Sequence, residues 1–407
     1  MSYDCKSWQV VPNYDVLNRK KNSGSAVAEA RNRPIRILHH LGSLDRGGIE
    51  SWLVQVLRAI DRDAFKMDFL VRSGTSREYY EEICRLGSRV FSYSNSRNPF
   101  AFSRQVFDLV ANVGPYDVIH SHLAHYDGFM MWVAARCGIK LRISHSHSDM
   151  RPIINTEKPI WKAYRHLGRT LIGRYATLRL AASSEAAAGL FGLGWRSKEN
   201  TQLFYCGIDL ERFGFQQEKA ASVRANLGIP ETATVIGHVG RFENVKNHAF
   251  LLRIAKAACN LDRNVLFLLV GRGSLREQMR AEAAALGLSS RVIFCDPRPD
   301  VPDIMMYCLD ALALPSLYEG LPLVVLEAQA ANLPVLVSDA VTSECVVAPD
   351  LVEFASLGAS PAYWASSLLA KATKTRRECA RNVLRGTPFD IRYSVKALAT
   401  LYSSINQ

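Results

Sequence analysis

The sequence lacks three features that would set it apart from soluble globular proteins. Among its 407 residues there is no stretch of about 18 uncharged apolar residues, which argues against a membrane-spanning helix. Its nine cysteines include no Cys-x-x-Cys pair, which argues against a disulfide framework or a cysteine zinc cage and favours reduced thiols. Residues 1–33 lack the apolar core and cleavage pattern of a signal peptide, so we expect a flexible N-terminal extension and a cytoplasmic protein.

The charge of the chain is unevenly distributed. Hydrophobic residues make up 48% and charged residues 22% of the sequence, and its length suggests two domains. Of the net charge of +12, residues 31–200 carry +10, from 25 Lys and Arg less 15 Asp and Glu. A basic half is typical of proteins that contact nucleic acid, anionic lipid or a phosphorylated substrate, and a solvated basic surface is the alternative.

Short apolar runs alternate with helical patterns through most of the chain, which indicates parallel sheets joined by crossover helices. A first α/β domain is predicted over residues 34–205, with a loop at 42–48 and an amphipathic helix from Ile49. Its strands are expected at residues 35–41, 67–71, 117–120, 141–145 and 178–182.

A second α/β domain is predicted over residues 206–388, and a last helix within 389–407 is expected to pack back on the first domain. Open α/β sheets bind ligands at the carboxyl ends of their strands, so the two domains should enclose a central cleft. The expected strands of the second domain are 234–240, 265–270, 291–295, 311–315 and 334–338, and its expected helices are 247–259, 275–286, 301–307 and 322–332.

Two glutamates and two cations stand near strand ends of the second domain. Glu319 falls in the loop after the fourth strand, and Glu327 lies on the helix that starts near Pro322. Carboxylates accept hydrogen bonds from pairs of sugar or ribose hydroxyls, although by spacing alone two surface glutamates beside a core helix are an equal alternative. Arg241 and Lys246 follow the first strand, where two cations neutralise a diphosphate leaving group without a metal. Together the four side chains predict a site for a donor that carries a sugar on a diphosphate.

Four histidines lie at the predicted ends of two neighbouring strands of the first domain, and we expect all of them to point into the cleft. They are His120, His122, His145 and His147. Two alternatives stay open for these residues. In the first, the histidines are structural, because histidines at strand ends commonly form their hydrogen bonds with the backbone. In the second, the four bind a metal together with Asp149.

Two other patterns do not lead to a cofactor. The run Asp61-Arg62-Asp63 matches the Asp-x-Asp pattern that binds Mn²⁺ or Mg²⁺ in some sugar transferases, but its place just past the first helix predicts a turn and a helix cap. Gly47-Gly48 does not match the Gly-x-Gly-x-x-Gly fingerprint. We therefore expect neither a divalent metal nor NAD.

The order of these motifs resembles the large retaining glycosyltransferase family 4, which has the GT-B fold: two Rossmann-like, doubly wound domains that face a central cleft. The resemblance covers roughly residues 34–405 and is closest to the bacterial exopolysaccharide and capsule glycosyltransferases. The motifs that carry it are Gly42…Gly47-Gly48, Gly240-Arg241…Lys246-Asn247, Gly271-Arg272-Gly273 and Glu319-x7-Glu327.

The resemblance implies a role for each matching position. Glu319 would contact hydroxyls of the donor sugar and Glu327 the ribose, while Arg241 and Lys246 would bind the diphosphate and stabilise it as it leaves. His147 would lie near the reacting sugar carbon, with His145 of the same His-Ser-His run as the alternative. The other donor-binding candidates are Gly47, Gly48, Gly240, Gly320 and Leu321. The acceptor-side candidates are His120, His122 and His145.

Two positions depart from the pattern of the family. Cys206 precedes the Gly207-Ile208-Asp209 turn where relatives often have Asn. The run Asp296-Pro297-Arg298 stands where a glycine usually precedes the segment that cups the base. The second departure leaves the base open, and uridine follows only from its frequency in the family.

The resemblance implies a retaining, metal-independent transfer of a sugar from a nucleotide sugar to a saccharide or lipid-linked saccharide acceptor, without a cofactor or nucleic acid. The alternatives are a nucleotide-sugar epimerase on the same fold and a histidine-based, metal-dependent hydrolase. The basic and aromatic stretch at 158–179 has two interpretations: a surface that lies on an anionic membrane at its inner face, or a crossover helix with a solvated basic face.

Overall fold

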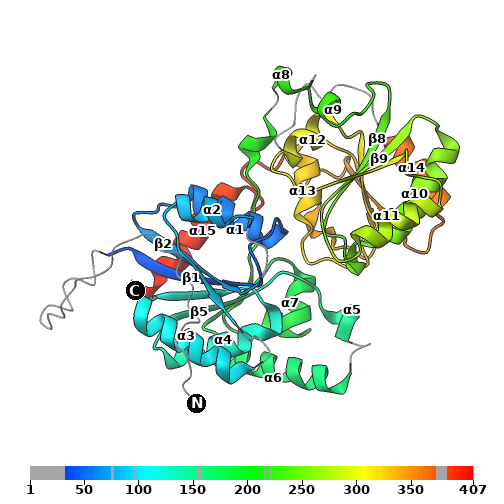
Figure 1. Cartoon of the computed structure of the whole chain (residues 1–407). Helices are drawn as coiled ribbons and strands as arrows, with labels where there is room; N and C mark the ends of the chain where they lie inside the picture. Colours follow the sequence, from blue (N-terminus) through cyan, green and yellow to red (C-terminus); the bar gives the residue numbers. More distant parts are fainter. Residues whose placement is uncertain are drawn as a thin grey trace, which may run out of the picture.

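The computed structural model describes residues 33–74, 78–94, 98–154, 158–214, 216–220, 222–372 and 383–406. All of the predicted N-terminal extension except Arg33 therefore lies outside the described residues. The described chain forms two α/β units, each built on one parallel sheet with helices on both faces (Figure 1).

The first sheet has seven parallel strands in the order β3-β2-β1-β4-β5-β6-β7. Its strands are β1 (Ile35–Leu41), β2 (Phe65–Arg72), β3 (Val90–Tyr93), β4 (Val118–Ser121), β5 (Leu141–Ser146), β6 (Leu178–Ala181) and β7 (Thr201–Leu203). The chain reverses its direction of winding between β1 and β4, which is the position where ligands bind in such sheets.

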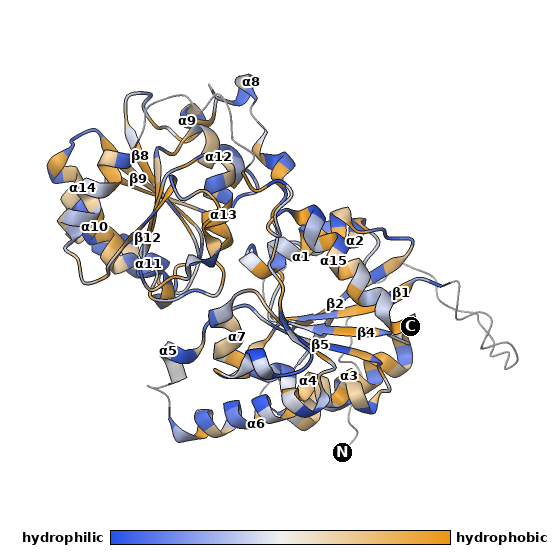
Figure 2. Ribbon diagram, turned by 180° about the vertical axis from the view of Figure 1, so that it is seen from behind, coloured by the Kyte–Doolittle hydropathy of each residue, from blue (hydrophilic) through white to orange (hydrophobic). Residues whose placement is uncertain are grey.

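The second sheet has six parallel strands in the order β10-β9-β8-β11-β12-β13, and its winding reverses between β8 and β11. Its strands are β8 (Thr234–Val239), β9 (Val265–Val270), β10 (Val292–Cys295), β11 (Ala311–Leu314), β12 (Val335–Ser338) and β13 (Val352–Ala355). All six residues of β9 are buried and apolar, as expected for a strand covered on both faces (Figure 2).

Helices cover both faces of each sheet. The longer ones are α1 (Gly48–Ala59), α3 (Pro99–Val113), α4 (Asp127–Arg136), α6 (Pro159–Tyr175), α7 (Ser184–Phe191), α10 (His248–Leu261), α11 (Arg276–Ala285), α13 (Leu323–Ala330), α14 (Pro361–Lys371) and α15 (Ile391–Ser403). The shorter ones are α2 (Tyr80–Arg85), α5 (Arg151–Ile154), α8 (Gln217–Ala220), α9 (Val223–Asn226) and α12 (Val301–Tyr307). Within the described ranges, every helix is too short or too polar to cross a lipid bilayer.

The last helix, α15, returns to the first sheet and lies beside α1 (Figure 1). Its Tyr402 is fully buried, and the Tyr402 hydroxyl lies 2.8 Å from Nδ1 of His120 in β4. The end of the chain therefore closes one face of the first domain's core.

The predicted strands all correspond to observed ones, but the sequence pattern missed three. These are β3, β7 and β13, which have three or four residues each and lie at sheet edges. Such short runs show neither a full alternation nor a sustained apolar pattern. The sequence predicts that Pro322 begins the helix, but in the structure Pro322 is the N-cap and α13 begins at Leu323.

Candidate functional site

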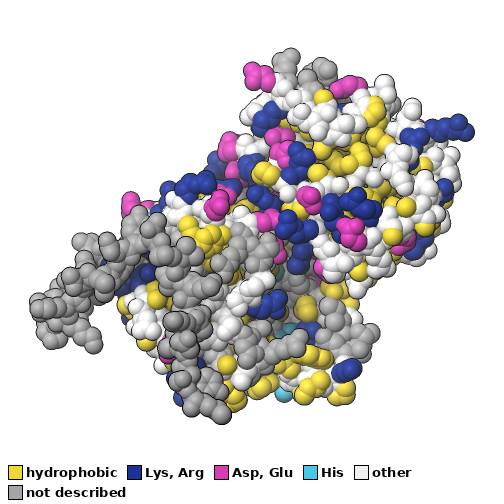
Figure 3. Space-filling view, viewed as in Figure 1, with side chains coloured by type: hydrophobic (Ala, Val, Ile, Leu, Met, Phe, Trp, Pro, Cys, Tyr) yellow, Lys and Arg dark blue, Asp and Glu magenta, His cyan; other side chains and the backbone are white. Residues whose placement is uncertain are grey.

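A cavity of about 740 Å³ lies between the two sheets, at the carboxyl ends of their strands. Figure 3 shows Lys and Arg side chains gathered where the two lobes meet. The first domain contributes the loop before α1, the first turn of that helix and the loop after β5, while the second contributes the loops after β8, β9 and β11 and the first turns of α13. This is the position that the sequence predicts for the ligand.

Lys246 and Glu319 form an ion pair on the cavity wall of the second domain. Lys246 ends the short 3-10 turn Asn244–Lys246 after β8, and Glu319 lies in the loop between β11 and α13. Lys246 Nζ donates to Glu319 Oε1 over 2.5 Å. The two loops are joined because the backbone N–H of Leu317 donates to the carbonyl of Val245 over 2.8 Å. Both charged side chains are mostly buried, so the pair is held by its surroundings and presents one cation and one carboxylate to the cavity.

Arg241 and Gly240 line the same wall, directly after β8. Opposite them, the Glu50 carboxyl in the first turn of α1 also lines the cavity. Burial raises the pKa of Glu50 to about 7, although its own backbone N–H and the Arg241 guanidinium act in the opposite direction. A carboxyl with such a pKa changes charge near neutral pH, so the net charge of this part of the cavity depends on pH.

Glu327 lies on α13, one helical turn deeper than the loop that carries Glu319. Burial raises the pKa of this carboxyl to about 7, and the Arg212 guanidinium, which also lines the cavity, opposes the shift. The structure therefore separates the two glutamates: Glu319 is ion-paired with Lys246, whereas Glu327 faces the cavity from a helix and forms no ion pair with any other described residue.

The remaining glycines of the predicted donor site lie either at the start of α1 or at the contact between the two domains. Gly47 is the N-cap of α1, and Gly48 is its first residue; both line the cavity, as does Leu321. Gly320 packs against the other domain, because a Cβ there would overlap the carbonyl oxygen of His147. Gly320 therefore sets how closely the second domain approaches the first.

One of the four predicted histidines lines the cavity. His147 follows β5 directly and contributes to the wall, with its Nδ1 3.8 Å from Sγ of Cys206, another wall residue. The expectation that His120, His122 and His145 also point into the cleft is wrong. They are at most 5% exposed, because His120 and His145 lie inside β4 and β5 and helix α1 covers the sheet with Trp52.

The Asp-x-Asp run forms the predicted turn. The backbone N–H groups of Asp63 and Ala64 donate to Asp61 Oδ1 over 2.9 and 3.3 Å, and these residues are exposed, away from the cavity. The basic stretch at 158–179 is mostly helix α6, whose Ile160, Trp161 and Leu167 are 70%, 53% and 47% exposed. A contact of this helix with an anionic membrane stays a prediction.

The sequence reasoning missed several charged residues of the cavity. Those from the first domain and the following linker are Asp45, Arg46, Glu50, Arg72 and Arg212, and Arg272 and Arg298 come from the second. Arg272 also reaches across the domains, with Nη2 2.6 Å from Glu78 Oε1. Asp45, Arg46, Arg272 and Arg298 lie in loops after strands, a position that many solvated residues share. Glu50 lies on α1, Arg72 ends β2 and Arg212 lies in a 3-10 turn, where nothing in the pattern marks them.

Comparison with known proteins was consistent with this geometry. The family described as "Glycosyltransferase Family 4" matches residues 46–212, and the family described as "Glycosyl transferases group 1" matches residues 220–354. The two matches cover the two halves of the chain that form the cavity.

Three similar proteins are informative. The "Putative glycosyltransferase EpsF" of Bacillus subtilis (strain 168) is 34% identical over 377 residues, which are 90% of this chain and 96% of that protein. The crystal structure of Anabaena HepE in complex with UDP-glucose has a TM-score of 0.75 at 20% identity, covering 91% of this chain and all of the other. An Escherichia coli UDP-Gal:alpha-D-GlcNAc-diphosphoundecaprenol alpha-1,3-galactosyltransferase is 33% identical over 144 residues, 35% of this chain and 37% of that one.

Proposed function

Because the chain belongs to glycosyltransferase family 4 and has the GT-B fold, as its sequence predicted, we propose that it is a retaining, metal-independent hexosyltransferase. It moves a sugar from a nucleoside diphosphate, UDP in our proposal, to a saccharide or lipid-linked saccharide acceptor. The reaction belongs to the synthesis of a surface polysaccharide and takes place on the cytoplasmic side of the membrane.

The observation that carries this proposal is the group of Lys246, Glu319 and Arg241 on one wall of the interdomain cavity. Two cations beside each other match the charge of a diphosphate, and a carboxylate held next to them is placed to accept hydrogen bonds from sugar hydroxyls. Glu327, deeper on the same wall, is in our proposal the acceptor for the ribose hydroxyls.

The proposed chemistry is a displacement on the face that the leaving group occupies. The bond between the anomeric carbon and the diphosphate oxygen breaks, and the acceptor oxygen forms its bond on the same face. The acceptor proton passes to the leaving diphosphate, while Arg241 and Lys246 stabilise the negative charge that develops there. Among the described residues of the second-domain wall, no carboxylate is proposed as a covalent nucleophile, because Glu319 is ion-paired and Glu327 lies deeper on α13.

The similar proteins support the choice of substrates. One was crystallised with UDP-glucose, and the name of another gives a UDP-sugar donor and a diphosphate-lipid acceptor. A diphosphate-linked acceptor also suits the arginines of the first-domain side, Arg46 and Arg72, although each of these has other partners.

Thermal unfolding with a set of nucleotides and nucleotide sugars tests the donor, since a ligand at 100 times its Kd stabilises the folded state by about 2.7 kcal/mol. We expect UDP and one UDP-sugar to raise Tm. Transfer is then followed with the labelled sugar and a lipid-linked saccharide, and NMR of the product reads the anomeric configuration. Conversion of the donor without any acceptor would instead identify an epimerase, and an inverted product would exclude retention.

A further inference from the structure

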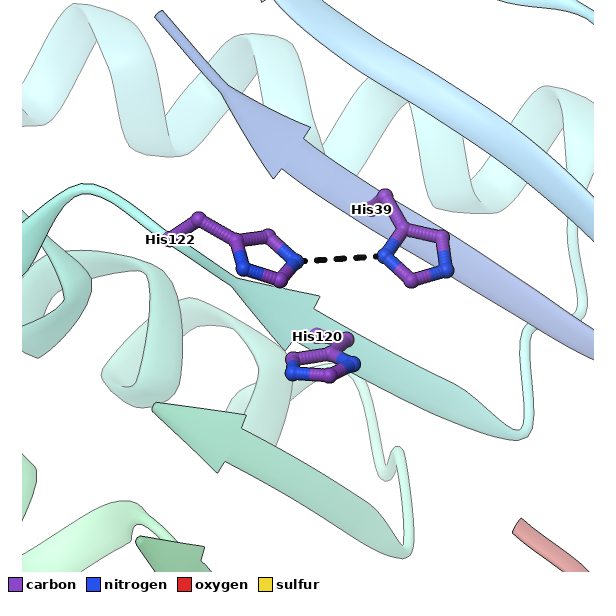
Figure 4. Close-up of side chains that lie close together, drawn as sticks. All are labelled: His39, His120 and His122. Carbon is purple, nitrogen blue, oxygen red and sulfur yellow. Dashed lines mark hydrogen bonds between the residues drawn. The ribbon is translucent and has the colours of Figure 1, made fainter. Parts of the chain in front are cut away.

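Five histidines form one buried cluster at the carboxyl edge of the first sheet. They are His39 from β1, His120 and His122 at the end of β4, and His145 and His147 at the end of β5. Figure 4 shows three of them on neighbouring strands, with the His39 and His122 rings joined by a hydrogen bond. Of the five, only His147 lines the cavity.

The contacts in this cluster run in two separate lines. In the first, His39 Nδ1 lies 3.2 Å from His122 Nε2, and His122 Nδ1 lies 2.9 Å from His147 Nε2. We call these three residues the histidine chain. In the second line, the Tyr402 hydroxyl contacts His120 Nδ1, and His120 Nε2 lies 3.1 Å from His145 Nδ1.

The rings of the histidine chain are neutral at physiological pH. Burial lowers the pKa of His39 and of His147 to about 3, and burial with the neighbouring rings lowers that of His122 well below its ordinary value. A neutral imidazole has one N–H donor and one acceptor nitrogen. In a line of such rings, the tautomer of one therefore fixes the tautomers of all.

A metal site is the competing explanation, because two groups of three histidine nitrogens lie within 4.8 Å: His39, His120 and His122, and His122, His145 and His147. Tetrahedral zinc at about 2.0–2.1 Å from each nitrogen requires three lone pairs that converge on one point. Here the short contacts join rings pairwise, and both nitrogens of His122 are engaged with different partners. Burial also raises the pKa of the nearby Cys206 thiol, so this group offers no negative charge to offset a buried cation.

The buried end of the histidine chain, at His39, indicates in which direction its hydrogen bonds are donated. His39 Nε2 is buried without a hydrogen-bond partner among the described residues. Buried N–H groups without a partner are rarer than buried acceptors without one, so Nδ1 of His39 should carry its proton. His39 then donates to His122 Nε2, His122 donates from Nδ1 to His147 Nε2, and the remaining proton of His147 is on Nδ1, next to Cys206.

We propose that His122 and His39 are positioning residues that hold His147 in the Nδ1–H tautomer, so that the neutral ring gives the cavity a hydrogen-bond donor for an oxygen of the bound sugar. The idea rests on the proposed function, because that sugar belongs to the donor. It explains why a histidine at the cavity wall is backed by two further histidines that do not reach the cavity. At metal sites, loss of a partner that orients a ligating histidine commonly costs about 10- to 100-fold in affinity or activity, and we expect an effect of the same size here.

The first test reads the tautomers directly. Protein with ¹⁵N-labelled histidine, with and without UDP-glucose, is studied by long-range ¹H–¹⁵N correlation at pH 7. We expect the Nδ1–H pattern for the three rings of the histidine chain. The pattern that disappears in His147→Gln is then assigned to His147. An Nε2–H pattern for His147 in the full-length protein would overturn the proposal, whether or not any transfer is detected, so this result is independent of the proposed function.

Two substitutions of His122 supply the second test. His122→Asn keeps a side-chain N–H that can donate to His147 Nε2, whereas His122→Leu removes it. We expect the leucine variant to lose about 10- to 100-fold in kcat with little change in donor KM, and the asparagine variant to stay within about threefold of the parent. Tyr402→Phe, in the second line, is the control that should lower Tm and leave the His147 tautomer unchanged. Equal kcat in all three variants would overturn the proposal, as would stoichiometric zinc binding that His39→Leu abolishes.

Discussion

The carboxyl edges of the two sheets differ in what they present to the cavity. At the ends of β4 and β5 the first sheet carries histidines, which burial keeps neutral and which are bonded to one another. The charged cavity residues of this domain, such as Arg46 and Glu50, lie in the loop after β1 and on α1. On the second sheet the side chains are a cation and a carboxylate, Lys246 and Glu319, which meet on the cavity wall. We infer that the second edge supplies charge for the leaving diphosphate and the first supplies shape and a neutral hydrogen bond.

The position of each residue relative to its strand end explains the difference. His120 and His145 lie inside β4 and β5, where a strand covered on both faces buries its side chains. Lys246 and Glu319 lie in loops, beyond the last hydrogen-bonded residues of β8 and β11. The position relative to the strand end thus accounts for His120, His145, Lys246 and Glu319, but not for His122, which follows β4 and is still buried.

The comparison is tested most strongly by removing the charge of the second edge. In Lys246→Ala we expect kcat to fall by about 10²- to 10³-fold, because a preorganised cation next to a developing negative charge is lost. Steady-state transfer with a saturating UDP-sugar measures the effect. Lys256→Ala, an exposed residue of α10 in the same domain, is the matched control. Near-normal turnover of Lys246→Ala, with both variants folded, would contradict the assignment of the second edge.

We expect a smaller loss of activity when the close contact between the two edges, at Gly320 and His147, is disturbed. A Cβ on Gly320 would overlap the His147 carbonyl oxygen, so Gly320→Ala must displace either the loop of Gly320, the backbone at His147 or one domain relative to the other. A misplacement of about 1 Å in an active site can cost about 10²-fold, and we expect a 10- to 100-fold lower kcat/KM with Tm changed by only a few degrees. Gly358→Ala, at a position where a Cβ would make only ordinary contact, is the control. Unchanged kinetics would show that the reacting enzyme does not need this close approach.

The sequence predicted the architecture well, because the alternation of apolar runs and helical patterns follows directly from the need to bury both faces of parallel strands. It also predicted Lys246 and Glu319 at the ligand edge, since both come clearly after a strand. It failed for His122, which follows β4 by one residue just as His147 follows β5. The Trp52 ring contacts both histidines, but of the two the His39 ring stacks on His122 alone, and His39 is distant from His122 in sequence.

The histidine cluster also contains His39, which the sequence reasoning overlooked. It lies inside β1 next to His40, and two histidines within a mostly apolar run show no functional signal. Its importance arises from the register of the sheet, because β1 pairs with β4 and places His39 opposite His120. Register between strands distant in sequence depends on tertiary packing, so a single sequence does not reveal it.

The smallest effect concerns which edge titrates near neutral pH. Histidines ordinarily change charge at about pH 6.5, but burial holds the pKa of His147 at about 3, so the first-edge histidine stays neutral from pH 6 to 8. Burial raises the pKa of Glu327 on the second edge to about 7, so this carboxyl, like that of Glu50 on α1, ionises in that range. For the unliganded protein, a raised carboxyl pKa stabilises the fold below about pH 4.5, and that contribution is lost as the pH rises through about 7.

Donor binding should follow the opposite direction, because the ionised form of Glu327 is the better acceptor for ribose hydroxyls. One pH unit below a pKa of about 7, roughly a tenth of the carboxyl is ionised, so Kd for UDP-glucose should rise about tenfold between pH 8 and pH 6. Calorimetry at several pH values measures it, and Glu327→Gln should bind more weakly at pH 8 with little remaining pH dependence. The pKa of Glu50 is also about 7, so Glu50→Gln separates the two carboxyls. If the dependence survives in Glu327→Gln and disappears in His147→Gln, the contrast between a neutral first edge and a charged second edge is wrong, since a histidine of the first edge would then be titrating.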